Sequence, residues 1–176
     1  MKIACIYEKI LAKLSDANLT VTKAMADDIS SWGAQDVRVL YDKPHSRFSR
    51  LDSVEKSDFL ERLGADIPAL KKVAQGTPLL VSSTSWTEDE DFSILLDAVA
   101  ECDASGQKMV LAITGKGPQK EFYLGEIKRR NLQNISIVTP WLQVEDYPKL
   151  LGCADLGVSL HSSSSGLDLP MKGEDT

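Results

Sequence analysis

The sequence contains few cysteines and histidines and no long apolar run. Its three cysteines, Cys5, Cys102 and Cys153, are odd in number and widely separated, without the paired spacing of a zinc site or a redox motif. No window holds the roughly 18 apolar residues that a membrane span needs, and the apolar stretch after Met1 is too short for a signal peptide. We therefore expect a reduced chain that faces the cytosol and holds no metal ion.

Basic residues are also scarce. The 176 residues include 20 Lys and Arg against 26 Asp and Glu, which gives a formal net charge of −6. This balance argues against a nucleic-acid-binding protein, because such proteins depend on clustered positive charge. A basic cluster at residues 128–130 falls at the end of a predicted helix, where cations interact favourably with the helix dipole. Phosphate binding by this cluster is the alternative interpretation.

The overall composition is that of a globular protein, 43% hydrophobic and 26% charged, without low-complexity tracts or repeats. The first forty residues predict the order helix, strand, helix, strand, at residues 7–14, 18–22, 22–32 and 37–41. Gly33 is well placed to end the second helix. Two strands are too few to bury both faces of a parallel sheet, so this region does not complete a sheet by itself.

A linker is expected at residues 41–49, because Pro44 cannot extend a central strand and restricts the residue before it. An amphipathic helix is predicted at residues 53–63, with Gly64 closing it. Residues 65–76 form a second polar region, whose helix content the pattern does not decide.

From residue 77 onward, strand and helix patterns alternate strongly. The predicted elements are strands at 78–83, 109–113, 135–138 and 156–160 and helices at 91–104, 119–131 and 144–153. Pro148 is expected to break the last helix in its first turn. Four strands separated by helices indicate a parallel sheet with right-handed crossovers. The predicted fold class is therefore α/β, with a Rossmann-like parallel sheet.

Open α/β sheets bind ligands at the carboxyl ends of their strands. Gly115, Lys116 and Gly117 lie there, between a strand and a helix, where glycines let a ligand approach the backbone and the helix N-terminus favours negative charge. Lys120 occupies the position of the third glycine of a dinucleotide fingerprint, and the sequence of a P-loop is missing too. A tight turn with Pro118 at the first helical position explains the same residues equally well.

Three other loops are expected at the same edge. The four carboxylates at residues 88–91 suit the first turn of the following helix, and metal binding or acid–base catalysis by them is the less favoured alternative. Trp141 can stack on a nucleobase or cover the core. His161 opens a run of serines that can hydrogen-bond to a sugar or phosphate oxygen, and Lys172 can neutralise a diphosphate or remain solvated. No triad-like spacing supports nucleophilic catalysis.

Several of these segments also carry a resemblance to one enzyme family. They are residues 22–25, 41–44, 82–92, 114–118, 139–142 and 163–172. On them, the chain resembles the chitobiosyldiphosphodolichol β-mannosyltransferases. The resemblance implies a GT-B fold of two Rossmann-like domains and the transfer of mannose from GDP-mannose to the chitobiose unit on dolichyl diphosphate. For the full-length family it implies the cytosolic face of the endoplasmic reticulum membrane, other mannosyltransferases of the pathway as partners, and neither metal nor cofactor.

In GT-B enzymes the second domain holds the nucleotide-sugar, so the resemblance implies a set of donor-binding residues. They are Ser85, Gly115, Lys116, Gly117, Trp141, Leu142, His161, Ser163, Ser164, Ser165, Gly166, Leu167, Asp168 and Lys172. The two glycines would lie near the diphosphate or sugar, Trp141 and Leu142 near the base, and residues 161–168 near the mannosyl phosphate. Related enzymes place an arginine and a lysine after the first strand of this domain. Here that region is acidic, which leaves Lys172 and the loop amides as expected replacements.

The resemblance also divides the chain. Residues 1–41 correspond to the end of an N-terminal acceptor domain, 42–76 to an interdomain linker with a helix, 77–172 to part of a C-terminal donor domain, and 173–176 to a divergent tail. Most of the family's acceptor domain has no counterpart, so the polypeptide alone is expected to be soluble, cytosolic and inactive in mannose transfer. The alternative is a non-catalytic nucleotide-sugar-binding or interaction module. A nicotinamide-dependent dehydrogenase is disfavoured by the missing fingerprint.

Overall fold

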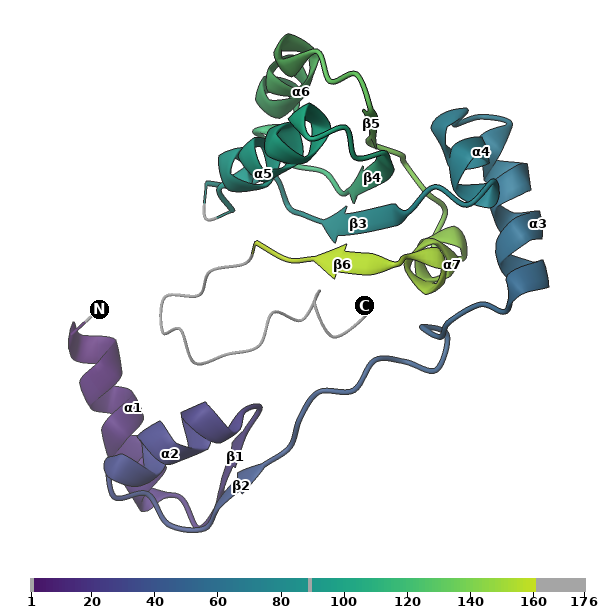
Figure 1. Cartoon of the computed structure of the whole chain (residues 1–176). Coiled ribbons are helices and arrows are strands. Elements are labelled where there is room, and N and C mark those ends of the chain that lie inside the picture. The colour runs from purple at the N-terminus through teal and green to yellow at the C-terminus, as the bar shows by residue number, and fades with distance from the viewer. Residues whose placement is uncertain (1, 89, 161–176) are drawn as a thin grey trace. The chain divides into compact units, whose positions relative to one another are not determined.

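The computed structural model describes residues 2–88 and 90–160. The described chain divides into two compact units, residues 2–43 and residues 44–160. Each unit has its own parallel sheet, of two strands in the first and four in the second (Figure 1). Among the described helices, none combines the length and the apolar character needed to cross a membrane.

The first unit has the predicted order of helix, strand, helix and strand. Its elements are α1 (Lys2–Leu14), β1 (Asn18–Thr20), α2 (Lys23–Ser31) and β2 (Val37–Val39). The N-cap of α2 is Thr22, whose hydroxyl accepts a 3.0 Å hydrogen bond from the Met25 amide and so satisfies one of the free donors at the helix start. Gly33 follows the helix with φ of 91°, a conformation that glycine adopts without strain. The predicted end of this helix is confirmed.

Much of the apolar surface of the first unit is uncovered. Ile6, Tyr7, Ile10, Leu11 and Leu14 of α1 are all exposed, although their spacing places them on one side of the helix. The two strands also leave Leu19 and Leu40 in solvent. As the sequence predicted, two strands and two helices do not bury both faces of this sheet.

The second unit is a layered α/β structure. Its elements are α3 (Ser53–Gly64), α4 (Ala69–Ala74), β3 (Leu79–Ser83), α5 (Phe92–Ala104), β4 (Met109–Thr114), α6 (Lys120–Arg130), β5 (Ile135–Val138), α7 (Asp146–Cys153) and β6 (Leu156–Val158). The strands lie in the order β5-β4-β3-β6, and each neighbouring pair is parallel. The predicted Rossmann-like parallel sheet is confirmed.

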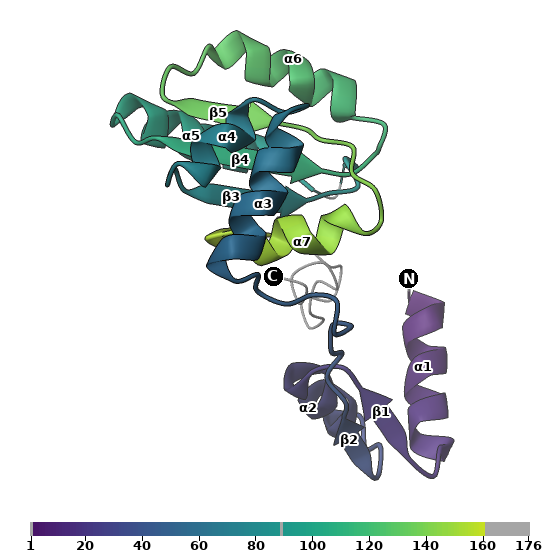
Figure 2. The same cartoon turned by 90° about the vertical axis from the view of Figure 1, so that its right-hand side faces the viewer.

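Two hydrophobic clusters hold the helices on the sheet. Strand β4 shows the alternation directly, because Val110 and Ala112 join the cluster under α3, α4 and α7, whereas Leu111 and Ile113 join the cluster under α5 and α6. Figure 1 shows the two groups of helices on either side of the strands, and Figure 2 shows the same layers after a quarter turn. The sheet is therefore buried on both faces, as a parallel sheet requires.

Three local predictions differ from the structure. Gly64 does not close α3 but is its last helical residue; it is buried, and a Cβ there would lie 2.7 Å from Cγ of Lys71, so it allows α4 to approach closely. Pro148 does not break α7, because it is the third helical residue, in the first turn, where no intrahelical amide donor is required. The last strand ends at Val158 rather than at residue 160.

Candidate functional site at the carboxyl edge of the sheet

The carboxyl ends of the four parallel strands of the second unit meet at one edge of the sheet. The loop after β3 spans residues 84–91, the loop after β4 spans 115–119, and the loop after β5 spans 139–145. The predicted donor-binding residues Ser85, Lys116 and Trp141 come from these three different loops. The topology therefore brings together residues that are far apart in the sequence.

The glycines after β4 are required by contact between two of these loops. Gly115 has φ of 124°, and a Cβ there would overlap the carbonyl oxygen of Thr84. A Cβ on Gly117 would overlap the carbonyl oxygen of Ser85. The amide of Gln119 donates a 3.0 Å hydrogen bond to the Trp86 carbonyl across the same boundary. The tight-turn interpretation of this motif is therefore sufficient to explain both glycines, and their contact with a donor stays a prediction.

The acidic loop after β3 contains two carboxylates with different environments. Asp91 is the N-cap of α5: its carboxylate accepts from the Ser93 amide at 3.0 Å and from the Ser93 hydroxyl, and these bonds lower the pKa of the carboxyl group. Glu90 is buried and only 4% exposed. Its carboxylate accepts from the Thr84 hydroxyl and, at 3.0 Å, from the Ser85 amide.

The predicted helix-start role therefore fits Asp91 but not Glu90. Instead, Glu90 holds the Thr84 side chain and the Ser85 backbone at the carboxyl end of β3. A buried carboxylate with two such donors orients a loop, because its desolvation is offset by hydrogen bonds. The sequence offered no signal that singles out Glu90 from its acidic neighbours.

Trp86, in the loop between β3 and α5, is buried beneath the surface of the candidate site. It is fully buried and stacks on Phe92 with ring centroids 4.8 Å apart, and Tyr123 completes the aromatic group. Its backbone is left-handed, with φ of 50°, which is uncommon outside glycine. The indole Nε1–H finds no hydrogen-bond partner among the described residues. Trp86 therefore supports the β3–α5 loop from below and presents no surface to a ligand.

Trp141 has the opposite environment. It is 64% exposed, which excludes the interpretation that it covers the core. The ammonium nitrogen of Lys116 lies 3.8 Å from the centroid of its ring. Leu142, the next residue, is half-buried and packs against the cluster under α3, α4 and α7. Trp141 and Lys116 thus form an exposed cation–π pair, whereas packing accounts for the side chain of Leu142.

Tyr147, near the start of α7, reaches the ends of two strands. Its hydroxyl shares a 2.7 Å hydrogen bond with the hydroxyl of Ser83, the last residue of β3. Thr114, the last residue of β4, donates to the same Ser83 hydroxyl at 3.2 Å. Sequence reasoning did not select these residues. The helical spacing of Tyr147 from the buried Leu150 and Leu151 was the available signal that its ring faces inward.

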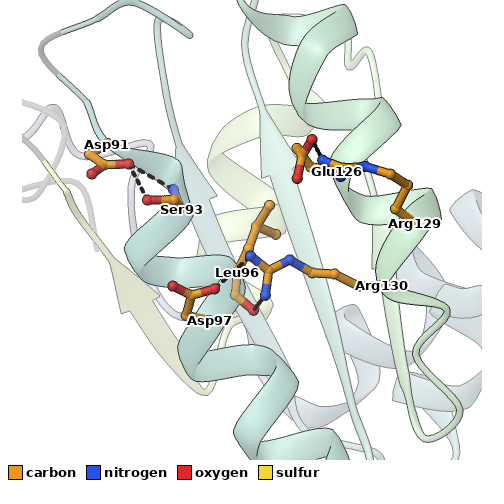
Figure 3. A network of polar contacts seen from close by, with 7 residues as sticks. All are labelled: Asp91, Ser93, Leu96, Asp97, Glu126, Arg129 and Arg130. Atoms are coloured by element: carbon orange, nitrogen blue, oxygen red, sulfur yellow. Dashed lines mark hydrogen bonds and ion pairs between the residues drawn. The ribbon is translucent and has the colours of Figure 1, made fainter.

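The basic cluster at residues 128–130 lies in the last turn of α6 and is occupied by structural contacts. Figure 3 shows the guanidinium of Arg130 crossing to α5, where it donates to the Leu96 carbonyl at 3.1 Å and to the Asp97 carboxylate at 2.6 Å. Arg129 pairs with Glu126 on its own helix. Because the cluster is at the opposite end of α6 from the Gly115–Gly117 loop, it does not face the candidate site. The helix-end interpretation fits better than phosphate binding.

Six of the predicted donor-binding residues can thus be located. Ser85 and Gly117 are in contact through their backbones, Lys116 lies over Trp141, and Gly115 contacts Thr84. The other eight lie outside the described residues; they are His161, Ser163, Ser164, Ser165, Gly166, Leu167, Asp168 and Lys172. Within residues 2–88 and 90–160, no group of three His, Cys, Asp or Glu side chains is placed to hold a metal ion.

Comparison with solved structures concerns the fold. The chain is similar to S. aureus TarM, with a TM-score of 0.53 and 10% sequence identity, over 81% of this chain and 25% of TarM. At this identity the likeness concerns the fold alone, which is of the GT-B type. The parallel sheet with a loop-built carboxyl edge is therefore part of a GT-B-type α/β fold.

Sequence comparison finds several relatives with one name. The chain is 44% identical to human chitobiosyldiphosphodolichol beta-mannosyltransferase, over 94% of this chain and 43% of that protein. It is 40% identical to the Dictyostelium discoideum protein of the same name, over 98% of this chain and 43% of that protein. No family model matches the chain. By sequence, the chain is therefore similar to the chitobiosyldiphosphodolichol beta-mannosyltransferases along nearly its whole length, and it spans less than half the length of these two relatives.

Proposed function

We propose that the second unit is the donor-binding part of a mannosyltransferase and binds GDP-mannose at the carboxyl edge of its sheet. The observation that carries this proposal is the exposed pair of Lys116 and Trp141, because two loops place a flat aromatic ring and a cation side by side at the edge where α/β sheets bind ligands. The names of the relatives, which are mannosyltransferases, support the same reaction class.

In this proposal, each group of the site has a distinct role. The exposed ring of Trp141 stacks on the guanine base, since base–aromatic stacking needs an accessible ring face. Lys116 then turns toward the diphosphate and neutralises its charge. The start of α6, whose N-cap makes no side-chain capping bond, directs the positive end of the helix dipole toward a phosphate group. Glu90 holds the β3–α5 loop in place beside them.

The transfer itself needs a second substrate. A hydroxyl oxygen of the acceptor forms a bond to C1 of mannose and loses its proton to water, the bond from C1 to the phosphate oxygen breaks, and GDP leaves with the bonding electron pair. Positive charge at the diphosphate favours this departure, which is the role proposed for Lys116 and Lys172. The names of the relatives point to dolichyl-diphosphate chitobiose as the acceptor. We place the reaction of the whole enzyme at the cytosolic face of the endoplasmic reticulum membrane.

Calorimetric titration of the purified chain tests the donor proposal. GDP and GDP-mannose are expected to bind, and UDP and NAD to bind at least tenfold more weakly. A folded chain that gives no heat with GDP or GDP-mannose contradicts the proposal. Tight NAD binding would instead favour the interpretation as a nicotinamide-dependent dehydrogenase. A radiolabelled mannose-transfer assay on chitobiosyl-diphosphate lipid tests separately the expectation that this polypeptide alone does not turn over.

The uncovered face of α1 favours a second candidate function, that of a non-catalytic interaction module. Ile6, Ile10 and Leu14 present apolar area to solvent, and contiguous apolar surface of this kind marks interaction sites. Sedimentation velocity of the wild-type chain and of an Ile10→Lys variant distinguishes the two functions. Self-association that the substitution abolishes, together with absent GDP binding, favours the interaction module.

A further inference from the structure

The segment that leads into α3 contacts α7 at three points. The Phe48 ring meets the Tyr147 ring edge to face, with centroids 6.1 Å apart and an interplanar angle of 82°. The Leu51 amide donates a 3.3 Å hydrogen bond to the Gly152 carbonyl. A Cβ on Gly152 would overlap the Ser49 carbonyl oxygen, so the absence of a side chain there allows the close approach. Residues 48–51 therefore lie directly against α7.

The same tyrosine connects this segment to the candidate site. On one side, the Tyr147 ring packs against Phe48; on the other, its hydroxyl bonds to Ser83 at 2.7 Å. The Ser83 hydroxyl is in turn the acceptor for Thr114. Ser83 is followed by Thr84 and Ser85, and Thr114 is followed by Gly115, so both strands end in the loops that contact each other. Tyr147 thus contacts residues 48–51 directly through Phe48 and the end of β3 through Ser83, and it is linked to the end of β4 through the bond between Ser83 and Thr114.

We propose that Tyr147 is a positioning residue that couples residues 48–51 to the β3–α5 and β4–α6 loops and holds those loops in a donor-binding arrangement. The consequence for ligand affinity rests on the proposed function; the coupling itself does not. The hydroxyl chain, which runs from Tyr147 through Ser83 to Thr114, links the side chains at the ends of two strands whose backbones are paired, while the aromatic contact with Phe48 sets the position of the tyrosine ring.

Hydrogen–deuterium exchange on the full chain tests the coupling without any ligand. In Tyr147→Phe, which removes only the hydroxyl, peptides covering residues 84–86 and 115–119 are expected to exchange about fivefold faster, the effect of losing one hydrogen bond. Peptides from α3 and α4, which pack on the same core cluster as Tyr147, are expected to stay unchanged. Tyr7→Phe, which alters an exposed tyrosine of the first unit, is the matched control.

Two further variants separate positioning from general destabilisation. Phe48→Ala is expected to reproduce the loop-specific change, and Phe48→Leu to restore most of the protection by refilling the contact. A double-mutant cycle of Ser83→Ala and Tyr147→Phe is expected to be non-additive, because the two substitutions remove the same bond. Additive effects, an equal rise of exchange in α3 and α4, or unchanged exchange in both loops would overturn the proposal.

A GDP titration links the coupling to the site. If the wild-type chain binds GDP, Tyr147→Phe is expected to weaken binding about fivefold, while Tyr7→Phe leaves it unchanged. If Tyr147→Phe raises hydrogen exchange only in the two loops but does not weaken GDP binding, Tyr147 does not position these loops for the ligand. If the wild-type chain does not bind GDP, the proposed function fails, and the exchange experiment still decides whether Tyr147 couples the segment to the loops.

Discussion

The ammonium nitrogen of Lys116 lies 3.8 Å from the ring centroid of Trp141, although the two residues follow different strands. A cation over an exposed tryptophan face is attracted by about 0.5–1 kcal/mol. This is enough to favour one arrangement of two surface loops and small enough for a stacking ligand to displace. The pair therefore suits a site in which a planar base takes the ring face and the cation moves to a phosphate.

Replacing Trp141 tests this arrangement. Trp141→Ala is expected to weaken GDP binding by about tenfold or more, because stacking of a base on an aromatic ring contributes about 1–3 kcal/mol. Trp141→Phe should retain most of the affinity. Isothermal titration calorimetry measures both, with Phe122→Ala as the control, since Phe122 is an equally exposed aromatic residue on α6. Equal affinities of the Trp141→Ala and Phe122→Ala variants would remove Trp141 from the site.

The glycines after β4 give a second prediction, on stability. Gly117→Ala places a methyl group on the Ser85 carbonyl oxygen and is expected to lower the free energy of unfolding by about 1–3 kcal/mol, the usual effect of overpacking. Gly125→Ala, inside α6 with open space around it, should instead raise it by about 0.5–1 kcal/mol. Urea denaturation compares the two. A neutral Gly117→Ala would mean that the loops separate at little cost.

The sheet could be predicted from the sequence because its strands are short, mostly apolar and regularly spaced between helical patterns. The alternation of Val110 and Ala112 with Leu111 and Ile113 shows why: a strand buried on both faces leaves an uninterrupted apolar run. The starts of the helices near Thr22 and Asp91 could be predicted as well, because the signals for a helix start lie in neighbouring residues.

The details of the site depend on which loops touch, and sequence spacing does not report that. Gly64 was predicted to end the helix, whereas in the structure its lack of a side chain leaves room for Lys71 of α4. The burial of Glu90 among exposed neighbours follows from the position of Thr84 and Ser85 in space. For the same reason the partnership of Tyr147 with Ser83 was not predicted, since it joins residues from a helix and a strand distant in the chain.

Arg130 provides a prediction on how α5 and α6 are held together. Its planar guanidinium contacts both the Leu96 carbonyl and the Asp97 carboxylate, which a lysine ammonium does not match (Figure 3). Arg130→Lys is expected to lower the free energy of unfolding by about 1 kcal/mol. Arg129→Lys, which alters an exposed ion pair within one helix, should change it by less than about 0.5 kcal/mol.

Thermal or urea unfolding of the two variants at neutral pH measures this difference. Raising the salt concentration should weaken the Asp97 contact, which is exposed on the aspartate side, more than the bond to the Leu96 carbonyl. If Arg130→Lys is as stable as Arg129→Lys, packing rather than the guanidinium contacts joins the two helices.

Asp103 gives a prediction on pH. Its carboxylate accepts hydrogen bonds from the backbone amides of Gln133, Asn134 and Ile135, which lower its pKa in the folded chain. The bonds hold the start of β5 against the end of α5. Because the folded pKa lies below the unfolded value of about 3.9, the carboxylate contributes its full stabilisation above that value. This contribution is lost as the pH falls through the folded pKa.

Asp103→Asn removes both the charge and part of the acceptor capacity, since the amide nitrogen cannot accept from a backbone N–H. The variant is expected to be less stable at pH 7 and to lose less stability between pH 5 and pH 3 than the wild type, so that the two curves approach each other in acid. Urea midpoints measured across this range check the expectation. Parallel curves would show that Asp103 keeps the same proton affinity in the folded and unfolded chains.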